Sequence, residues 1–422
     1  MSTHPPITGR PVRVALVGAG NRGLTYLEWI KAHPERAQLV AVADPRPAAR
    51  AAARAAAGAP VEFDDWRPLA EERIADAVIV ATQDRDHVEP VLALARAGYA
   101  ILAEKPLAPT EEETRTLVEG VREAGVLFAV CHVMRYQPYT DLVKRVVDSG
   151  VLGQLVSVDH LEPVGWWHYA HSYVRGPWSS EKTSSPMLLA KSCHDLDWIT
   201  YVTGGRIEEV ASFGGLAHFR PENAPEGSAE RCLDCAVEAG CPYSALKLYM
   251  PTLRERGAVW PVTHVTEATD EAGLVEALRE GPYGVCVYRS DNDVVDHQAL
   301  AMRMSGGVTA TFQMMAFTEQ THRQTRIFGS HGWLRGDGER VTVQDFRTGD
   351  TVTHELGTSG SNAADGHGGG DPALVEAFVR AVATGDPGAV RSGTTASLGS
   401  HLAAFAAERA RHTGTVQKVP AH

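Results

Sequence analysis

The sequence lacks the long apolar runs and the basic charge that membrane and nucleic-acid-binding proteins need. None of its runs reaches the ~18 consecutive apolar residues of a membrane-spanning helix, so we expect no membrane segment. Its 52 acidic residues outnumber its 40 basic ones, and the net charge of −12 argues against nucleic acid or an anionic membrane as a partner. Residues Met1 to Pro11 are polar and proline-rich and lack the features of a signal peptide. We therefore expect a cytoplasmic protein.

Cysteine is also scarce, with 6 residues in a chain of 422. Without a secretion signal, free thiols or metal ligands are favoured over disulfide bonds. The remaining composition, with 44% hydrophobic and 22% charged residues, is that of an ordinary globular protein. The length predicts about two or three domains.

The first part of the chain alternates short apolar runs with helical segments. Strands are predicted at Val12–Val17, Leu39–Ala43, Ala77–Ala81, Ala100–Ala103 and Val126–Cys131. Helices are predicted between them, because alanine-rich or amphipathic stretches follow each strand. This alternation is typical of a parallel sheet that is covered by helices on both faces. We expect one doubly wound α/β domain over residues 10–135.

The pattern changes after Val133, where polar and apolar residues alternate as in half-exposed strands. Such runs lie at Leu155–Leu161, Ala299–Met304, Val308–Met315, Thr325–Phe328 and Val341–Phe346, and two helices are predicted near Ala373–Ala383 and Thr395–His412. We expect residues 136–422 to form an α+β domain with an open, mostly antiparallel sheet. The stretch from about 219 to 283 carries cysteines and little periodicity, which predicts an irregular insertion in this domain.

A glycine-rich turn joins the first strand to its helix, with Gly18, Gly20 and Gly23 in the spacing G-x-G-x-x-G. In this context the glycines permit the turn, the close approach of a pyrophosphate and the packing of helix on strand. Asp44 ends the next strand, where a carboxylate accepts hydrogen bonds from an adenosine ribose. The same carboxylate would repel a ribose phosphate, so we predict NAD rather than NADP. Arg46, two residues on, weakens that preference.

Four motifs resemble the glucose–fructose oxidoreductase and inositol dehydrogenase family (Gfo/Idh/MocA). They are the GAGNRG turn at 18–23, Ala81-Thr82 with His87, Glu104-Lys105-Pro106 after the strand Ala100–Ala103, and Cys193-His194-Asp195-Leu196-Asp197 at the start of a helix. Their order on the predicted elements is specific, although each motif alone is common. The resemblance covers nearly the whole chain except the insertion.

The resemblance implies a Rossmann domain and a second domain whose open sheet forms a homodimer or homotetramer. It implies that the cofactor is contacted by Gly18, Gly20, Asn21, Arg22, Gly23, Asp44, Thr82, His87, Glu104 and Lys105. It also implies that Lys105 and His194 face the nicotinamide from the two domains. The sequence departs from many family members at Ala190, where they carry Asp, and Lys191 is the candidate to replace that residue.

Oxidation of an alcohol needs a base for the hydroxyl proton and a carbon held beside the nicotinamide. Lys105 is our candidate base, with Glu104 to orient it, and His194 is the second acid or base because imidazole titrates near neutrality. Lys191 is predicted to act as a further base or as a donor to the substrate. An ordinary solvated lysine at a helix start is the alternative for Lys191.

The richest stretch for substrate binding is 166–178, because aromatic faces stack on sugars and polar groups reach hydroxyls. A packed aromatic loop at an oligomer interface is the alternative. Arg175 is the predicted anion-binding residue, since a guanidinium grips carboxylate or phosphate in two places. The full set of predicted substrate residues is Arg135, Tyr136, His168, His171, Arg175, Trp178 and His367.

The insertion carries Cys232, Cys235 and Cys241 in the spacing C-x2-C-x5-C, which suits a structural zinc ion. Cys286, at the exit of the insertion, is the preferred fourth ligand, and Cys193 and His218 are rivals. Ordinary loop thiols or an iron–sulfur cluster are the alternatives.

Three functions remain open from the sequence. The leading one is NAD-linked hydride transfer at a hydroxyl-bearing carbon of a sugar, cyclitol or sugar derivative. The second is a glycosidase, in which transient oxidation acidifies a neighbouring C–H bond, the aglycone is eliminated and the cofactor is regenerated. The third is a non-catalytic NAD-binding sensor, which the intact Glu104-Lys105-Pro106 motif disfavours.

Overall fold

The computed structural model describes residues 6–58, 60–357 and 367–421. Part of the polar segment Met1 to Pro11 lies outside these residues, and so does Gly366, where the glycine-rich stretch 366–370 predicts a tight loop. Within the described chain, no helix is long and apolar enough to cross a membrane.

The first domain is a six-stranded parallel sheet with the strand order β3-β2-β1-β4-β5-β6. The strands are β1 (Val12–Val17), β2 (Ala37–Ala43), β3 (Val61–Phe63), β4 (Ala77–Val80), β5 (Ala100–Ala103) and β6 (Phe128–Val130), and the helices are α1 (Asn21–Ala32), α2 (Pro47–Ala57), α3 (Arg67–Glu71), α4 (Val88–Arg96) and α5 (Glu111–Ala124). Side chains of β1 alternate between two apolar cores, one on each face of the sheet. The strand order reverses between β1 and β4, which is where doubly wound sheets bind ligands.

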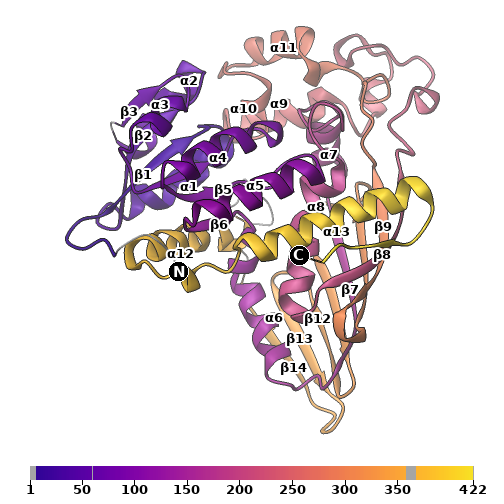
Figure 1. The fold of residues 1–422 in the computed structure, drawn as a ribbon. Coiled ribbons are helices and arrows are strands. Elements are labelled where there is room, and N and C mark those ends of the chain that lie inside the picture. Colours follow the sequence, from indigo (N-terminus) through magenta and orange to yellow (C-terminus); the bar gives the residue numbers. More distant parts are fainter. Residues whose placement is uncertain (1–5, 59, 358–366, 422) are drawn as a thin grey trace.

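The second domain is built on a nine-stranded sheet with the order β14-β13-β12-β11-β7-β10-β9-β8-β15. Its strands are β7 (Leu155–Pro163), β8 (Ile207–Gly215), β9 (His297–Met304), β10 (Thr309–Met315), β11 (Gln324–Gly329), β12 (Gly332–Gly336), β13 (Arg340–Asp345), β14 (Thr351–Glu355) and β15 (Gln417–Lys418). Only β7 and β10 pair in parallel, so the mostly antiparallel sheet is confirmed. The helices α6 (Pro138–Asp148), α8 (Met187–Thr203) and α13 (Thr394–Thr413) pack on one face of this sheet (Figure 1).

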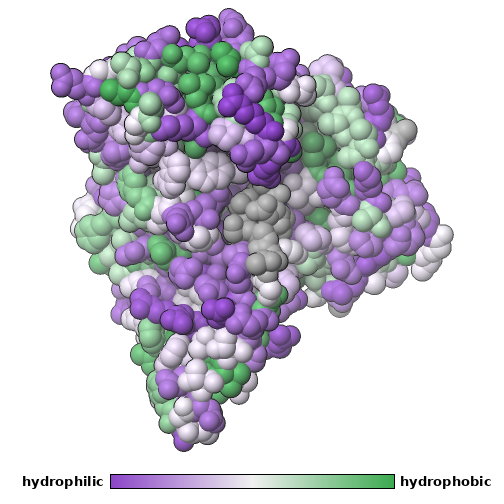
Figure 2. Space-filling view, turned by 180° about the vertical axis from the view of Figure 1, so that it is seen from behind, coloured by the Kyte–Doolittle hydropathy of each residue, from purple (hydrophilic) through white to green (hydrophobic). Residues whose placement is uncertain are grey.

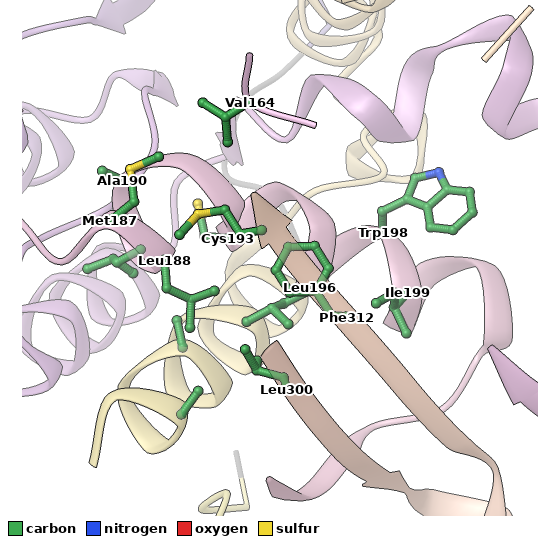
Figure 3. Close-up of a cluster of buried hydrophobic side chains, with 14 of the residues drawn as sticks. Val164, Met187, Leu188, Ala190, Cys193, Leu196, Trp198, Ile199, Leu300 and Phe312 are labelled. Atoms are coloured by element: carbon green, nitrogen blue, oxygen red, sulfur yellow. The ribbon is translucent and has the colours of Figure 1, made fainter. Parts of the chain in front are cut away.

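Helix α8 is the centre of the second domain's core. Leu196 lies close to Phe312 of β10 and Leu300 of β9, and Trp198 points away on another side of the helix (Figure 3). Because α8 is buried on nearly every side, its polar residues His194 and Asp195 are held in the interior, and the side chain of Lys191 is largely buried. This burial places the predicted reactive residues on a rigid element.

The opposite face of the sheet carries exposed residues at alternate positions, including Phe213 and Phe328. Seen from behind, the tapering lower part of the molecule mixes such hydrophobic side chains with hydrophilic ones (Figure 2). The expected open face is therefore present.

The segment between β8 and β9 is more regular than we predicted. It contains α9 (Ala245–Arg256), α10 (Val262–Val265) and α11 (Glu271–Glu280), with a small core of its own. Ser244 and Asp270 cap α9 and α11, since their side chains accept hydrogen bonds from the third residue beyond them. The prediction of an irregular insertion was therefore wrong. In α9 the helical pattern was hard to recognise because the helix contains Pro251.

Near the C-terminus the chain returns to the first domain. Helix α12 (Gly370–Thr384) contributes Leu374, Phe378 and Val382 to a core that includes Val14 and Leu16 of β1. The Rossmann core is thus completed by a segment far outside residues 10–135.

Candidate active site

The glycine turn lies at the carboxyl end of β1, at the point where the strand order reverses. Gly18 has a φ of +88°, and a Cβ on it would lie 2.5 Å from the carbonyl oxygen of Ala81. A Cβ on Gly23 would lie 2.2 Å from the carbonyl oxygen of Gly18. Gly20 is the N-cap of α1 and has no side chain to cap the helix, so its N-terminal N–H groups receive no hydrogen bond from the cap residue. These features fit the pyrophosphate of a dinucleotide.

Asp44 lies beside this turn at the end of β2 and is 3% exposed. Its carboxylate accepts a hydrogen bond from the Ala19 amide at 2.9 Å, and Arg46 donates to both of its oxygens at 3.0 Å. Burial raises the pKa of Asp44, but the hydrogen bonds from Arg46 and Ala19 outweigh it and hold the pKa below its usual value. The group is therefore ionised where a ribose would bind, and Arg46 is already engaged with it.

Some of the other residues expected at the cofactor are bound to protein groups. The buried ring of His87 lies 2.7 Å from the Pro106 oxygen and 3.1 Å from the Thr82 oxygen, so it joins the turns after β4 and β5. Arg22 pairs with Glu104 at 2.8 Å and with Asp371 at 2.5 Å. Thr82 lies in the turn after β4, and the exposed Asn21 starts α1.

Glu104 and Lys105 follow β5 at the same edge of the sheet. The buried carboxylate of Glu104 accepts from the Lys105 amide at 2.9 Å and from the Tyr26 hydroxyl. It therefore orients the backbone of Lys105 rather than its ammonium group. The Lys105 Nζ donates to the carbonyl oxygen of Ala190 on α8 at 2.5 Å, so this side chain spans the two domains. A backbone acceptor thus stands where many family members carry an aspartate.

His194 lies on α8 close to this lysine, with His132 and His367 beside it. The ring centroid of His194 is 5.8 Å from that of His132 and 6.0 Å from that of His367. His194 makes no hydrogen bond to any described residue, and its Nδ1 is buried. Burial, followed by the charge of Lys105, lowers the pKa of His194 well below its usual value. The imidazole is therefore neutral at pH 7 and able to accept a proton.

Lys191 belongs to a buried group of ionic side chains on the inner side of the sheet. Its Nζ lies 3.1 Å from Glu162, which also pairs with Arg323 at 2.6 Å. Arg323 in turn pairs with Asp195 at 2.9 Å. Burial lowers the pKa of Lys191, although Glu162 opposes this shift. The lysine is therefore an active-site candidate and not the solvated surface residue that was the alternative.

Two predicted substrate residues after β6 are engaged elsewhere. The guanidinium of Arg135 forms two hydrogen bonds to Asp197, at 2.6 and 2.8 Å, and stacks on Tyr201. The buried hydroxyl of Tyr136 lies 3.0 Å from the Ser392 hydroxyl. These contacts hold helices together, so the structure does not bring either side chain to the catalytic group.

Arg175 and His171 instead connect the second domain to its insertion. Arg175 donates to the carbonyl oxygens of Val285 at 2.7 Å and Tyr243 at 2.8 Å. His171 Nδ1 lies 2.9 Å from the Tyr249 hydroxyl. The expectation that Arg175 grips an anionic substrate is not supported by these contacts, because its Nε and Nη2 donate to backbone carbonyl groups of the insertion and the segment that follows it.

An aromatic cluster lies next to the ionic group. His168 bonds Gln320 at 3.2 Å, and the charge of Lys191 contributes to lowering its pKa after burial. The ring of Trp260, from the insertion, lies 5.6 Å from His168 and 5.3 Å from Trp167. Trp178 lies further along, with its Nε1 3.5 Å from Asp84. The partly exposed rings of Trp167, His168 and Trp260 are suited to stack on a ligand.

The four predicted zinc ligands, Cys232, Cys235, Cys241 and Cys286, line one cavity of about 20 Å³. All are free thiols, and burial raises the pKa of Cys241 and Cys286. As these side chains stand, no group of three or more His, Cys, Asp or Glu among the described residues is arranged to hold a metal ion. Zinc therefore stays a prediction.

The glycine turn, the ionised carboxylate after β2 and the Lys105–His194 pair together define a dinucleotide-binding oxidoreductase of two domains. Residues 12–132 match the profile of the oxidoreductase family with an NAD-binding Rossmann fold, and residues 140–239 match the GFO/IDH/MocA C-terminal domain. The chain belongs to this Gfo/Idh/MocA family, as its motifs indicated.

Relatives of this chain include enzymes with different reactions. It is 32% identical to inositol 2-dehydrogenase 4 of Saccharopolyspora erythraea over 53% of this chain and 62% of that one. It is 28% identical to 2,7-anhydro-N-acetylneuraminate hydratase of Escherichia coli over 50% and 55% of the two chains. The matches thus span little more than half of these relatives. The fold is similar to scyllo-inositol dehydrogenase of Lactobacillus casei with NAD(H) and scyllo-inositol, with a TM-score of 0.68 at 17% identity, covering 97% and 99% of the chains.

Sequence reasoning missed His132, Glu162 and Arg323. Glu162 could have been found from the alternation of its strand. It follows Val158 and His160 at every second position, on the side that faces the core, where a charged residue is unusual. His132 follows β6 at the same sheet edge as Lys105. Arg323 had no such pattern, since it lies in a connection between strands.

Proposed function

We propose that this protein is an NAD-dependent oxidoreductase that acts on a hydroxyl-bearing carbon of a sugar or cyclitol. The observation that carries the proposal is the hydrogen bond from Lys105 to Ala190, close to the neutral His194, at the binding edge of the parallel sheet. Removal of a hydroxyl proton requires a group that accepts the proton and a nearby cation that stabilises the alkoxide. Bound NAD supplies the acceptor or donor of the hydride.

The roles of the side chains follow from their charge. Lys105 Nζ donates to the substrate oxygen and stabilises the alkoxide, while the ring of His194 takes the hydroxyl proton. Glu104 fixes the backbone of Lys105, so the ammonium group is aimed across the cleft. Lys191, His168 and His367 bind further hydroxyls, which favours a polyol over a simple alcohol.

The test is a screen of sugars and cyclitols with NAD, read by NADH absorbance and by product analysis. Lys105→Ala should lower turnover about 10²-fold or more, because it removes the cation that stabilises the alkoxide. Lys31→Ala, on the exposed end of α1, is the control and should leave turnover unchanged. A near-normal rate for Lys105→Ala would remove this residue from the mechanism. Tight NAD binding without hydride exchange from any polyol would favour a sensor.

A redox-assisted glycosidase is the second candidate. The observation that favours it is the buried Lys191–Glu162 pair beside His168, because simple hydride transfer needs no further acid and base. Elimination of an aglycone needs them, and Trp167 and Trp260 offer a surface for a second ring. Such an enzyme would release an aglycone without net formation of NADH, whereas a dehydrogenase would accumulate NADH.

The assembly and location belong to the same proposal. The exposed Phe213 and Phe328 on the open face of the sheet favour a homodimer or homotetramer. Light scattering of the purified chain would test this, and a monomer at working concentration would contradict it. We place the enzyme in the cytoplasm, where nicotinamide cofactors are available.

A further inference from the structure

Four cysteines from separate turns of the insertion meet around one small cavity. Cys232 and Cys235 flank a short 3-10 turn, Cys241 follows a second one, and Cys286 comes 45 residues later in sequence. A cavity of about 20 Å³ is large enough for a single water molecule or ion and for nothing bigger. A chain with only 6 cysteines has therefore gathered four of them at a site the size of one ion.

The sulfur atoms receive the hydrogen bonds that a thiolate needs. The Ala245 amide lies 3.5 Å from the Cys232 Sγ, and Arg175 Nη2 lies 3.4 Å from the same atom. The Tyr243 and Tyr288 amides donate to Cys241 and Cys286. Donors around sulfur are the usual surroundings of a thiolate that ligates a metal.

The buried side chain of Arg175 is a second and independent sign that the cavity holds negative charge. Its guanidinium is 4% exposed and lines the same cavity, and its Nη1 is buried without a partner among the described residues. A buried cation with an unused donor is costly unless negative charge lies beside it. Four thiolates around a divalent cation carry a net charge of about −2, which would supply that charge.

We propose that Cys232, Cys235, Cys241 and Cys286 bind one structural Zn²⁺ ion as four thiolates, with Arg175 as the neighbouring cation. In the present arrangement the thiols line the cavity without closing on one point. Binding draws them together and releases the thiol protons to solvent. A structural role is favoured over a catalytic one, because four protein ligands leave no open coordination position for a substrate or water.

The proposed ion supports the substrate side of the cleft. The insertion has a core of only eight buried residues, and it carries Trp260 and Tyr283, which pack on the segment of His168 and His171. Arg175 is part of that segment and touches Cys232 directly. Fixing the cysteines therefore fixes the aromatic cluster but not the glycine turn.

The first test is the metal content of the full chain, purified under reducing conditions from zinc-supplemented growth. Mass spectrometry of metals should find about one zinc per chain. After removal by chelation, the protein should take up about one Co²⁺ and show the visible bands of tetrahedral cobalt bound to sulfur. Zinc below about a tenth per chain without cobalt uptake, iron with acid-labile sulfide, or two disulfides by thiol counting would each overturn the proposal.

The second test compares cysteine variants. Cys241→Ser should lower zinc content at least about tenfold, whereas Cys131→Ala, which removes a buried thiol of the Rossmann core, should keep it. Chelation of the wild type should speed proteolysis within residues 219–283 and leave NAD binding unchanged. Full zinc in Cys241→Ser would overturn the site. None of these measurements depends on turnover. The zinc proposal can therefore be tested even if the proposed reaction is wrong.

Discussion

At the scale of single residues, His132 is a buried side chain without hydrogen-bond partners among the described residues. It is 0% exposed, both ring nitrogens lack a partner among the described residues, and Asp197 lies 3.8 Å from its Nδ1. Its ring stands between those of His194 and His401, at 5.8 Å from each. This places a second neutral imidazole directly behind the proposed base.

We predict that His132 positions His194 by packing edge-on against its ring. His132→Phe keeps the ring volume and removes both nitrogens, so kcat/KM should fall by about tenfold or more while NAD affinity is kept. The acid limb of the pH profile should move to higher pH, because two neighbouring imidazoles disfavour each other's protonation and His132 thereby helps to lower the pKa of His194. An unchanged rate and pH profile would reduce His132 to a packing residue.

Asp44 gives a prediction about cofactor choice. Asp44→Ala should lower kcat/KM with NAD by about tenfold and raise the ratio of NADP to NAD turnover, because the carboxylate that binds a ribose is lost. The change also frees the three Arg46 donors that now bind Asp44, so that Arg46 can meet a phosphate. Kinetics with both cofactors check this, and an unaltered preference would contradict it.

The sequence located the candidate reactive residues better than their partners. Lys105, His194 and Lys191 were predicted from local motifs, and the structure brings them into one region. Arg135 was assigned to the substrate from its place just after the last predicted strand of the first domain, and Arg175 from the anion-binding chemistry of its guanidinium. Their partners, Asp197 and the Val285 carbonyl, lie 62 and 110 residues away in sequence, so no local pattern could indicate them.

At the scale of elements, α12 is the helix whose position the sequence did not indicate. Its apolar spacing predicted a helix near Ala373–Ala383, but not that the helix would cover the first domain. Phe378 is 1% exposed in a core shared with β1. The strands β8, β12 and β14 were also not predicted. Two glycines interrupt the pattern of β12, and β14 has no buried face because each of its residues is exposed.

Replacing Phe378 by alanine tests this packing. The variant should lose about 3–5 kcal/mol of unfolding free energy, since a buried aromatic ring leaves a cavity. Phe346→Ala is the matched control, because that ring is 55% exposed, and its loss should stay within about 0.5 kcal/mol. Urea unfolding of both variants measures the difference. Equal losses would show that α12 contributes little to the Rossmann core.

At the scale of the whole molecule, buried neutral histidines make stability depend on pH. Burial lowers the pKa of His171 and His401 to about 3, and those of His132, His168 and His194 well below their usual value. Below pH ~6.5 the unfolded chain binds these protons and the folded chain does not, so stability falls as the pH drops.

His171 and His401 should each cost ~2 kcal/mol of unfolding free energy between pH 7 and pH 5, at ~1.4 kcal/mol per pH unit below ~6.5. Denaturant titrations at several pH values measure this slope. His401→Gln removes one titrating group and should recover ~2 kcal/mol of the loss. Stability that is flat from pH 7 to pH 5 would mean that these rings gain protons without unfolding.

The return of α12 to the first domain has a consequence for exchanging parts between relatives. A chimera joined after residue 135 would pair the β1 core of one parent with the covering helix of another, and the two surfaces did not evolve together. A successful swap of cofactor specificity by grafting should therefore carry residues 370–384 along with the N-terminal lobe. The cofactor-binding domain of this protein is therefore encoded by two separate stretches of the gene.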